Sequence, residues 1–125
     1  MNAAKKIVTA YMNDVWVNRN VDAVDKYISA EEFIQHNPHL DNGKEALKAF
    51  LPYLFGTILP QGTWEVKRVI AEDDLVAVHS LAIAAPGHKG SAVVDIFRVA
   101  GDKIIEHWDL SHDVPETTKS GNPIV

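Results

Sequence analysis

The chain has 125 residues, of which 46% are hydrophobic and 23% are charged, and its formal net charge is −5. A chain of this length can bury roughly two-thirds of its unfolded surface, so we expect a single domain, 1–125, around one core. The negative charge offers no basic surface for nucleic acid. The absence of cysteine excludes disulfides, zinc-thiolate sites and a thiol nucleophile.

The first residues carry two lysines but become polar by Thr9 and Asn13, so they lack the continuous apolar core of a signal peptide. A membrane span needs about 18 or more consecutive apolar residues, and the sequence has no such run. We therefore expect a soluble, cytoplasmic protein without nucleic-acid or membrane partners.

Two helices are predicted at the start of the chain. Apolar residues recur at helical spacing over 4–18, and Asp22 can cap a second, short helix. A brief strand is expected over 32–35, ahead of a loop that contains Pro38.

A third amphipathic helix is predicted over 42–58, where Asn42 and Glu45 have the spacing of a capping box. Pro52 lies inside this segment. Because proline removes an amide donor and crowds the carbonyl group of Lys48, we expect a kink there.

The second half of the chain reads as an antiparallel meander with short connections. The helices precede these strands, an order typical of an α+β fold in which helices cover one face of a sheet. The second strand is apolar at odd and even positions, so we expect the helices to cover one of its faces and a second subunit the other. The predicted strands are 64–71, 75–85, 91–99 and 104–111, followed by an irregular tail over 115–125.

The stretch 93–113 predicts a hairpin in which an acid lies among core residues. Strand alternation puts Asp95 on the same face as Val93 and Phe97. An unpaired buried carboxylate costs several kcal/mol, so Asp95 needs a partner, a raised pKa or a wet cavity.

The partner of Asp95 depends on the hairpin turn. A three-residue loop over 100–102 with a bulge would set Asp95 opposite His107, with Asp109 one step beyond. A two-residue turn at Gly101 and Asp102 would set it opposite Trp108.

Three motifs, FIQHNP, VVDIFRV and DKIIEHWD, resemble those of the SnoaL-like polyketide cyclase family. This family belongs to the nuclear transport factor 2-like superfamily, with ketosteroid isomerase and limonene epoxide hydrolase, and the resemblance spans nearly the whole chain. It implies a cone-shaped, curved, mainly antiparallel sheet covered by three helices, with a mostly apolar pocket. It also implies a homodimer through the outer face of the sheet, and it favours the register that pairs Asp95 with His107.

The resemblance assigns roles to individual residues. Asp95 falls where ketosteroid isomerase carries its oxyanion-binding aspartic acid. His36 falls at the general base of that enzyme, and Asp109 at an acid of the epoxide hydrolase triad. Ser80 and Ala82 replace the rest of that triad, so epoxide hydrolysis of that kind is not expected.

The tyrosine that ketosteroid isomerase carries on its first helix has no counterpart. Asp14 lies near its place, and Tyr11 is nearly a turn away. Steroid isomerisation in its standard form is therefore not expected either.

These residues predict a cofactor-independent enzyme that isomerises or cyclises a small, largely apolar carbonyl compound. His36 would take a proton α to the carbonyl group, and Asp95, supported by His107, would donate to the enolate. Asp109 would serve as a second acid or orienter. We expect the pocket to be lined by Tyr11, Trp16, Phe33, Phe50, Leu54, Ser80, Ala82, Phe97 and Trp108.

Each assignment has a structural alternative. Asp95 could be a buried acid satisfied by backbone amides or by His107, and His36 could cap the loop beside Pro38. The whole protein could hold an apolar ligand without turnover, or simply dimerise.

Two groups of residues suggest a metal site: His36 and His39 have H-x-x-H spacing, and His107, Asp109 and His112 lie close in sequence. The first pair spans a proline, and strand alternation puts His107 and His112 on opposite faces. We therefore expect no metal and no cofactor.

Overall fold

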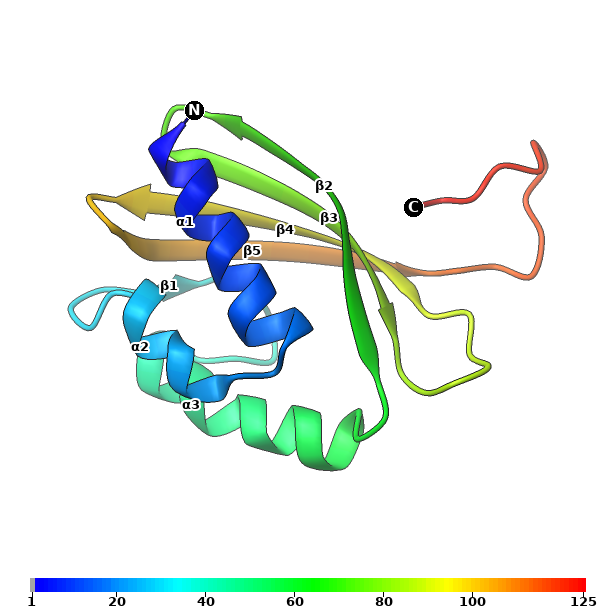
Figure 1. Cartoon of the computed structure of the whole chain (residues 1–125), viewed down its shortest axis with the longest axis horizontal. Helices are drawn as coiled ribbons and strands as arrows, with labels where there is room; N and C mark the ends of the chain where they lie inside the picture. Colours follow the sequence, from blue (N-terminus) through cyan, green and yellow to red (C-terminus); the bar gives the residue numbers. More distant parts are fainter. Residues whose placement is uncertain (1) are drawn as a thin grey trace.

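The computed structural model describes residues 2–125. Three helices lie on one side of a five-stranded, curved and open sheet (Figure 1), which confirms the predicted α+β fold. Helix α1 runs across the sheet, whereas α2 and α3 lie at one end of it.

Helix α1 (Ala3–Tyr11) begins at Asn2, whose side chain accepts a hydrogen bond from the backbone amide of Lys5. It continues as a wider π-helical segment, Met12–Val17. Val8, Tyr11 and Val15 are buried along one side, as the predicted amphipathic pattern requires.

The second helix is short: a 3₁₀ turn, Val21–Ala23, leads into α2, Val24–Tyr27. Helix α3 (Lys44–Tyr53) contains Pro52 and then widens into a π-helical segment, Leu54–Ile58. A proline in a helix disturbs the hydrogen-bond ladder, and the winding changes directly after Pro52. The kink itself stays a prediction.

The predicted capping box of α3 is wrong. Gly43 is the N-cap residue, with φ of 95°, and no side chain caps the helix. The Asn42 side chain instead accepts a hydrogen bond from the backbone amide of Gln35 at 2.9 Å. Asn42 therefore holds β1 against this loop.

The sheet has the strand order β1-β5-β4-β3-β2. Strands β2 to β5 form the predicted antiparallel meander, and the two-residue β1 pairs with β5 in parallel. Residues 114–125 contain no helix or strand. The strands are β1 (Ile34–Gln35), β2 (Thr63–Glu72), β3 (Leu75–Ile83), β4 (Ser91–Ala100) and β5 (Lys103–Asp113).

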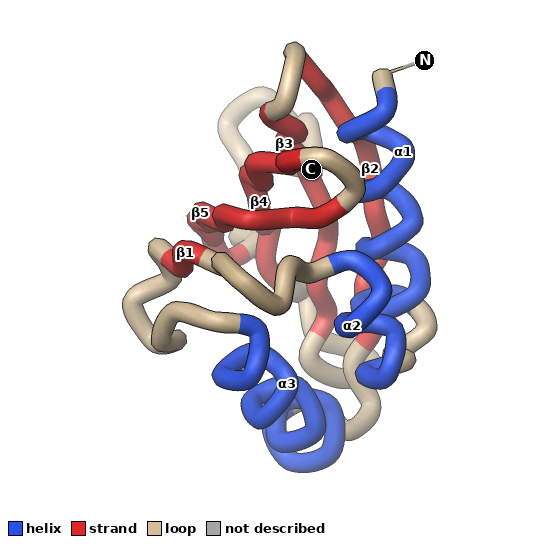
Figure 2. The backbone as a smooth tube through the Cα atoms, turned by 90° about the vertical axis from the view of Figure 1, so that its left-hand side faces the viewer, coloured by secondary structure: helices blue, strands red, loops and turns tan. Residues whose placement is uncertain are grey.

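The helices lie on one side of the sheet (Figure 2), and buried apolar side chains from the helices and the strands form one core. Alternation along the strands directs Val76 and Val78 of β3, and Phe97 and Val99 of β4, into this core. Asp95 shares the face of Phe97, and only 6% of its surface is exposed.

The outer face of the sheet is not covered by helices, and apolar side chains lie exposed on it. Ile70 is 67% exposed, Leu110 is 80% exposed, and Val94 and Ile96 are each exposed by more than a third. None of the helices among the described residues is long and apolar enough to cross a membrane.

Candidate functional site

The β4–β5 hairpin determines which residues face Asp95. Its turn is the two-residue Gly101–Asp102 turn, and Ile105 then forms a β-bulge, the one extra residue on β5. The bulge shifts the register by one residue, so that Asp95 lies directly opposite Asp109.

Both pairings considered from the sequence, Asp95 with His107 and Asp95 with Trp108, are therefore wrong. The hairpin has both a two-residue turn and a separate bulge in β5. Neither of the two alternatives, a three-residue loop with a bulge or a two-residue turn alone, included both features. His107 is the strand partner of Phe97, and so it is a diagonal neighbour of Asp95 on the same face. The diagonal position still brings the two side chains together.

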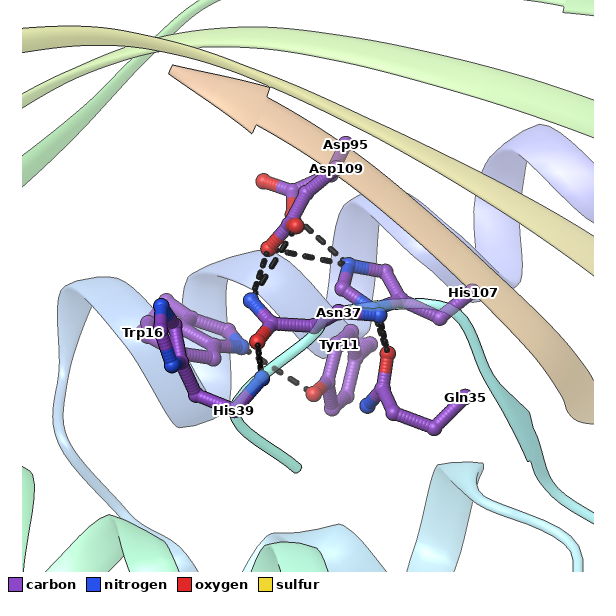
Figure 3. A network of polar contacts seen from close by, with 8 residues as sticks. All are labelled: Tyr11, Trp16, Gln35, Asn37, His39, Asp95, His107 and Asp109. Atoms are coloured by element: carbon purple, nitrogen blue, oxygen red, sulfur yellow. Dashed lines mark hydrogen bonds and ion pairs between the residues drawn. The ribbon is translucent and has the colours of Figure 1, made fainter. Parts of the chain in front are cut away.

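Asp95 and His107 form a buried pair (Figure 3). Asp95 Oδ1 lies 2.8 Å from His107 Nε2, and the two side chains are 8% and 10% exposed. Burial raises the pKa of Asp95, the contact with His107 opposes that rise, and the negative charge of Asp109 adds to it. The pair can therefore share one proton.

Gln35 determines which ring nitrogen of His107 carries a proton. Gln35 Oε1 accepts a hydrogen bond from the backbone amide of Asn37, which can only donate, so this atom is the amide oxygen. His107 Nδ1 lies 2.7 Å from the same oxygen and must be the donor. His107 therefore directs Nε2 toward Asp95.

The contacts of Asn37 identify its side-chain oxygen and nitrogen in the same way, and its nitrogen binds Asp109. Its Oδ1 accepts from the backbone amide of His39 at 2.8 Å, so its Nδ2 is the donor to Asp109. That nitrogen lies 3.1 and 2.9 Å from the two carboxylate oxygens. The Asp109 side chain remains 22% exposed, and its Oδ2 is 4.0 Å from His107 Nε2.

These polar groups lie on the wall of a cavity of about 60 Å³ between the sheet and the helices. Tyr11 Oη accepts a hydrogen bond from Trp16 Nε1 at 3.0 Å, and burial raises the pKa of this tyrosine. The lining residues are Tyr11, Trp16, Phe33, Gln35, Asn37, Leu40, Leu47, Phe50, Trp64, Asp95, Phe97, His107 and Asp109.

Five of the nine expected wall residues line this cavity, and four do not. Leu54 packs against the core, and Ser80 is fully buried in the sheet. Ala82 lines a neighbouring surface groove of about 400 Å³. Trp108 lies on the outer face, where its ring stacks on that of His36.

The structure does not bring His36 to the cavity. Its side chain is 41% exposed, and Nε2 contacts Glu106 Oε2 at 2.8 Å on the outer face. Its ring is parallel to that of Trp108, with a centroid distance of 4.8 Å. Glu106 also contacts Arg98, and the hydrogen bonds from His36 and Arg98 lower the pKa of this carboxyl.

The sequence interpretation missed Gln35 and Asn37. The signal was present in FIQHNP, because an extended backbone directs alternate residues to one side. Phe33 is buried, so Gln35 and Asn37 follow it to the inside and His36 goes to the outside. His36 is a titrating residue and was therefore favoured, whereas the side-chain amides of Gln35 and Asn37 occupy the site.

Among the described residues, one group could hold a metal ion: Asp95, His107 and Asp109, whose ligand atoms all lie within 4.8 Å of one another. It does not include His36, His39 or His112. The 2.8 Å contact between Asp95 and His107 favours a shared proton, which a cation would have to displace.

Comparison with solved structures shows what the fold resembles. A SnoaL-like protein of unknown function from Burkholderia thailandensis is 19% identical, with a TM-score of 0.73 over 90% of this chain and 97% of that one. A protein provisionally named as a polyketide cyclase, from Acidithiobacillus ferrooxidans, is 21% identical, with a TM-score of 0.72 over 89% of both chains. An LEH-like epoxide hydrolase of M. tuberculosis is 22% identical, with a TM-score of 0.67 over 88% and 83%.

At these identities the solved structures establish the fold alone, and no curated protein sequence matches the chain. The family assignment comes from the sequence itself, since residues 8–107 match the model of the SnoaL-like domain. The chain therefore belongs to the SnoaL-like family.

Proposed function

We propose that this protein is a cofactor-independent acid–base enzyme that isomerises or cyclises a small carbonyl compound. The observation that carries the proposal is Asp95 Oδ2, a buried oxygen of a cavity-lining carboxyl that has no hydrogen-bond partner among the described residues. An unpartnered acid beside a cavity, with a raised pKa, is the arrangement that donates to a developing oxyanion.

Asp95 acts as the hydrogen-bond and proton donor to the carbonyl oxygen of the substrate. Burial favours its protonated form, and His107 is placed to replenish its proton through the 2.8 Å contact. Gln35 holds the histidine so that the nitrogen facing Asp95 can take up and return this proton. The two residues work as one proton-sharing pair.

Asp109 takes the role of base that the sequence assigned to His36. It lies directly opposite Asp95 on the inner face, and Asn37 holds its carboxylate in place. Its partial exposure admits a substrate that also contacts Asp95. A base within reach of the α-carbon and an acid at the oxygen are the two groups that enolisation needs.

The proton balance closes within these three residues. Asp109 takes the proton from the α-carbon while the Asp95–His107 pair gives one to the oxygen, so an enol forms. In an isomerisation, Asp109 gives its proton to a different carbon of the enol while the enol O–H proton returns to the Asp95–His107 pair, so the carbonyl group forms again. In a cyclisation, the enol carbon bonds to a second carbonyl carbon of the same molecule. Its O–H proton then returns to the pair, and Asp109 protonates the new alkoxide.

The ligand is a carbonyl compound with a largely apolar surround. Phe33, Phe50 and Phe97 supply the apolar walls, and the polar groups converge on one side. A cavity of about 60 Å³ holds only the reacting end of such a molecule, since an apolar cavity that binds benzene measures about 150 Å³.

We extend the proposal to a homodimer through the outer face of the sheet. Ile70 and Leu110 are the most exposed large apolar residues on that face, and no helix covers them. Apolar patches of this kind mark protein–protein contacts. The partner is a second copy of the chain.

The proposal is tested by deuterium exchange at the α-carbon of a panel of small ketones in D₂O, followed by NMR. We expect protein-dependent exchange, reduced at least about 100-fold in Asp109→Asn and reduced in Asp95→Asn, as for loss of a general acid or base. His36→Ala is the matched control, and it should exchange at the wild-type rate. If no ketone shows protein-dependent exchange, the enzymatic assignment fails and a ligand-binding module remains.

A further inference from the structure

Trp64 has an indole N–H without a partner. Three buried side-chain polar atoms lack a hydrogen-bond partner among the described residues: Trp64 Nε1, Ser80 Oγ and Asp95 Oδ2. The three residues lie on the inner face of the neighbouring strands β2, β3 and β4. Trp64 pairs with Ala82, which is two positions from Ser80 and so shares its face. Only Trp64 and Asp95 also line the cavity.

The neighbouring Trp16 shows that this cavity wall can satisfy an indole. Trp16 Nε1 donates to Tyr11 Oη, whereas Trp64 Nε1 does not reach a comparable acceptor. The two indole rings pack against each other, with centroids 4.7 Å apart and planes at 46°. Trp64 Nε1 is itself buried, so its N–H does not reach solvent in this structure.

A buried N–H group is normally hydrogen-bonded, and a phenylalanine would fill an apolar wall without an unpartnered donor. The unpartnered polar atoms of the residues that line the cavity therefore indicate what a ligand must offer. Asp95 Oδ2 serves the reacting carbonyl group of the proposed reaction. The indole can only donate, so it requires an acceptor on the ligand.

We propose that Trp64 Nε1 donates a hydrogen bond to a second oxygen of the substrate, which is therefore a hydroxyketone or dicarbonyl compound. The inference rests on the proposed function, because that function places the reacting carbonyl at Asp95. Trp64 is then a specificity-determining residue: it selects among ketones of equal size by the presence of an oxygen acceptor. Ser80 takes no part, since it is fully buried and does not line the cavity.

The test uses two probes of the same size, 4-hydroxybutan-2-one and pentan-2-one, which differ by a hydroxyl group in place of a methyl group. The full-length protein carries ¹⁵N-labelled tryptophan, and the indole N–H signals are assigned with single Trp→Phe variants. Titration then gives a dissociation constant for each ketone and shows which indole senses the hydroxyl group.

We expect wild type to bind the hydroxyketone about tenfold more tightly than pentan-2-one, near the upper end of what one hydrogen bond contributes. Trp64→Phe keeps an aromatic ring against Trp16 and should lose this preference. Trp108→Phe alters the outer-face tryptophan and should keep it. In wild type, the Trp64 indole proton should move downfield with the hydroxyketone and not with pentan-2-one.

The outcomes separate the two proposals. If both ketones bind wild type equally, or if Trp64→Phe keeps the preference, the role of Trp64 is refuted and the proposed function stands. If neither ketone binds, the ketone pocket itself is refuted, and this inference falls with it. The indole shift in wild type decides the matter even if Trp64→Phe does not fold.

Discussion

Replacement of Asp95 by asparagine should make the stability of the protein less dependent on pH. Burial raises the pKa of Asp95 above 3.8, the usual value for an aspartic acid side chain. The folded protein therefore keeps this proton to a higher pH than the unfolded chain does. The stability that the group contributes is complete below about pH 3.8 and is lost as the pH rises through the raised pKa.

The magnitude follows from one proton. Between the unfolded and folded pKa values, wild type loses stability relative to Asp95→Asn by at most about 1.4 kcal/mol per pH unit. Near pH 4 the two proteins should differ by about 1 kcal/mol or less, because asparagine can keep the hydrogen bond to His107. The free energy of unfolding of Asp95→Asn relative to wild type should therefore be higher at pH 8 than at pH 4.

The assay is urea unfolding at fixed protein concentration from pH 4 to pH 8, followed by tryptophan fluorescence. Asp102→Asn is the matched control, since Asp102 is an exposed aspartate in the hairpin turn and should show no such trend. His107, Asp109 and Tyr11 face Asp95 and are present in both proteins. A difference that is flat with pH, or that shrinks as the pH rises, would show that pairing with His107 outweighs burial and would refute the reasoning.

Two further predictions concern the support of the site and the outer face. Gln35→Leu removes the acceptor of the His107 Nδ1 proton, so the free energy of unfolding, measured by urea unfolding, should fall by about 1–3 kcal/mol. Gln61→Leu, in an exposed loop, is the control and should have little effect. Leu110→Lys on the outer face should convert a dimer to a monomer, as measured by size-exclusion chromatography with light scattering. Val17→Lys on the helical side is the control and should leave the dimer intact. A monomeric wild type would contradict the dimer.

Most of the fold was predictable because it depends on local periodicity. The apolar repeat over 4–18 predicted the first helical segment, and the four β-prone runs predicted the meander. The ends of elements were harder to predict. Asn42 has the right spacing for a capping box, but the hydrogen bond to Gln35 in β1 competes for its side chain, and that partner comes from another element.

The site was predicted in part. Asp95, His107 and Asp109 come together as the alternation of the strands suggested, but the contact of Asp95 with His107 is diagonal instead of directly across the strands. His36 was assigned from its residue type, and its neighbour Gln35 has the inward position.

The sequence by itself determined which residues share a face, since alternation in a strand is a property of the backbone, and this placed the acid Asp95 in the core beside Phe97. Only the tertiary structure decided which groups meet that acid. The bulge at Ile105 shifts β5 by one residue, and β1 arrives from a distant part of the chain to bring Gln35 and the neighbouring Asn37 to the site. Register and long-range pairing depend on packing between elements, which no local pattern of residues specifies.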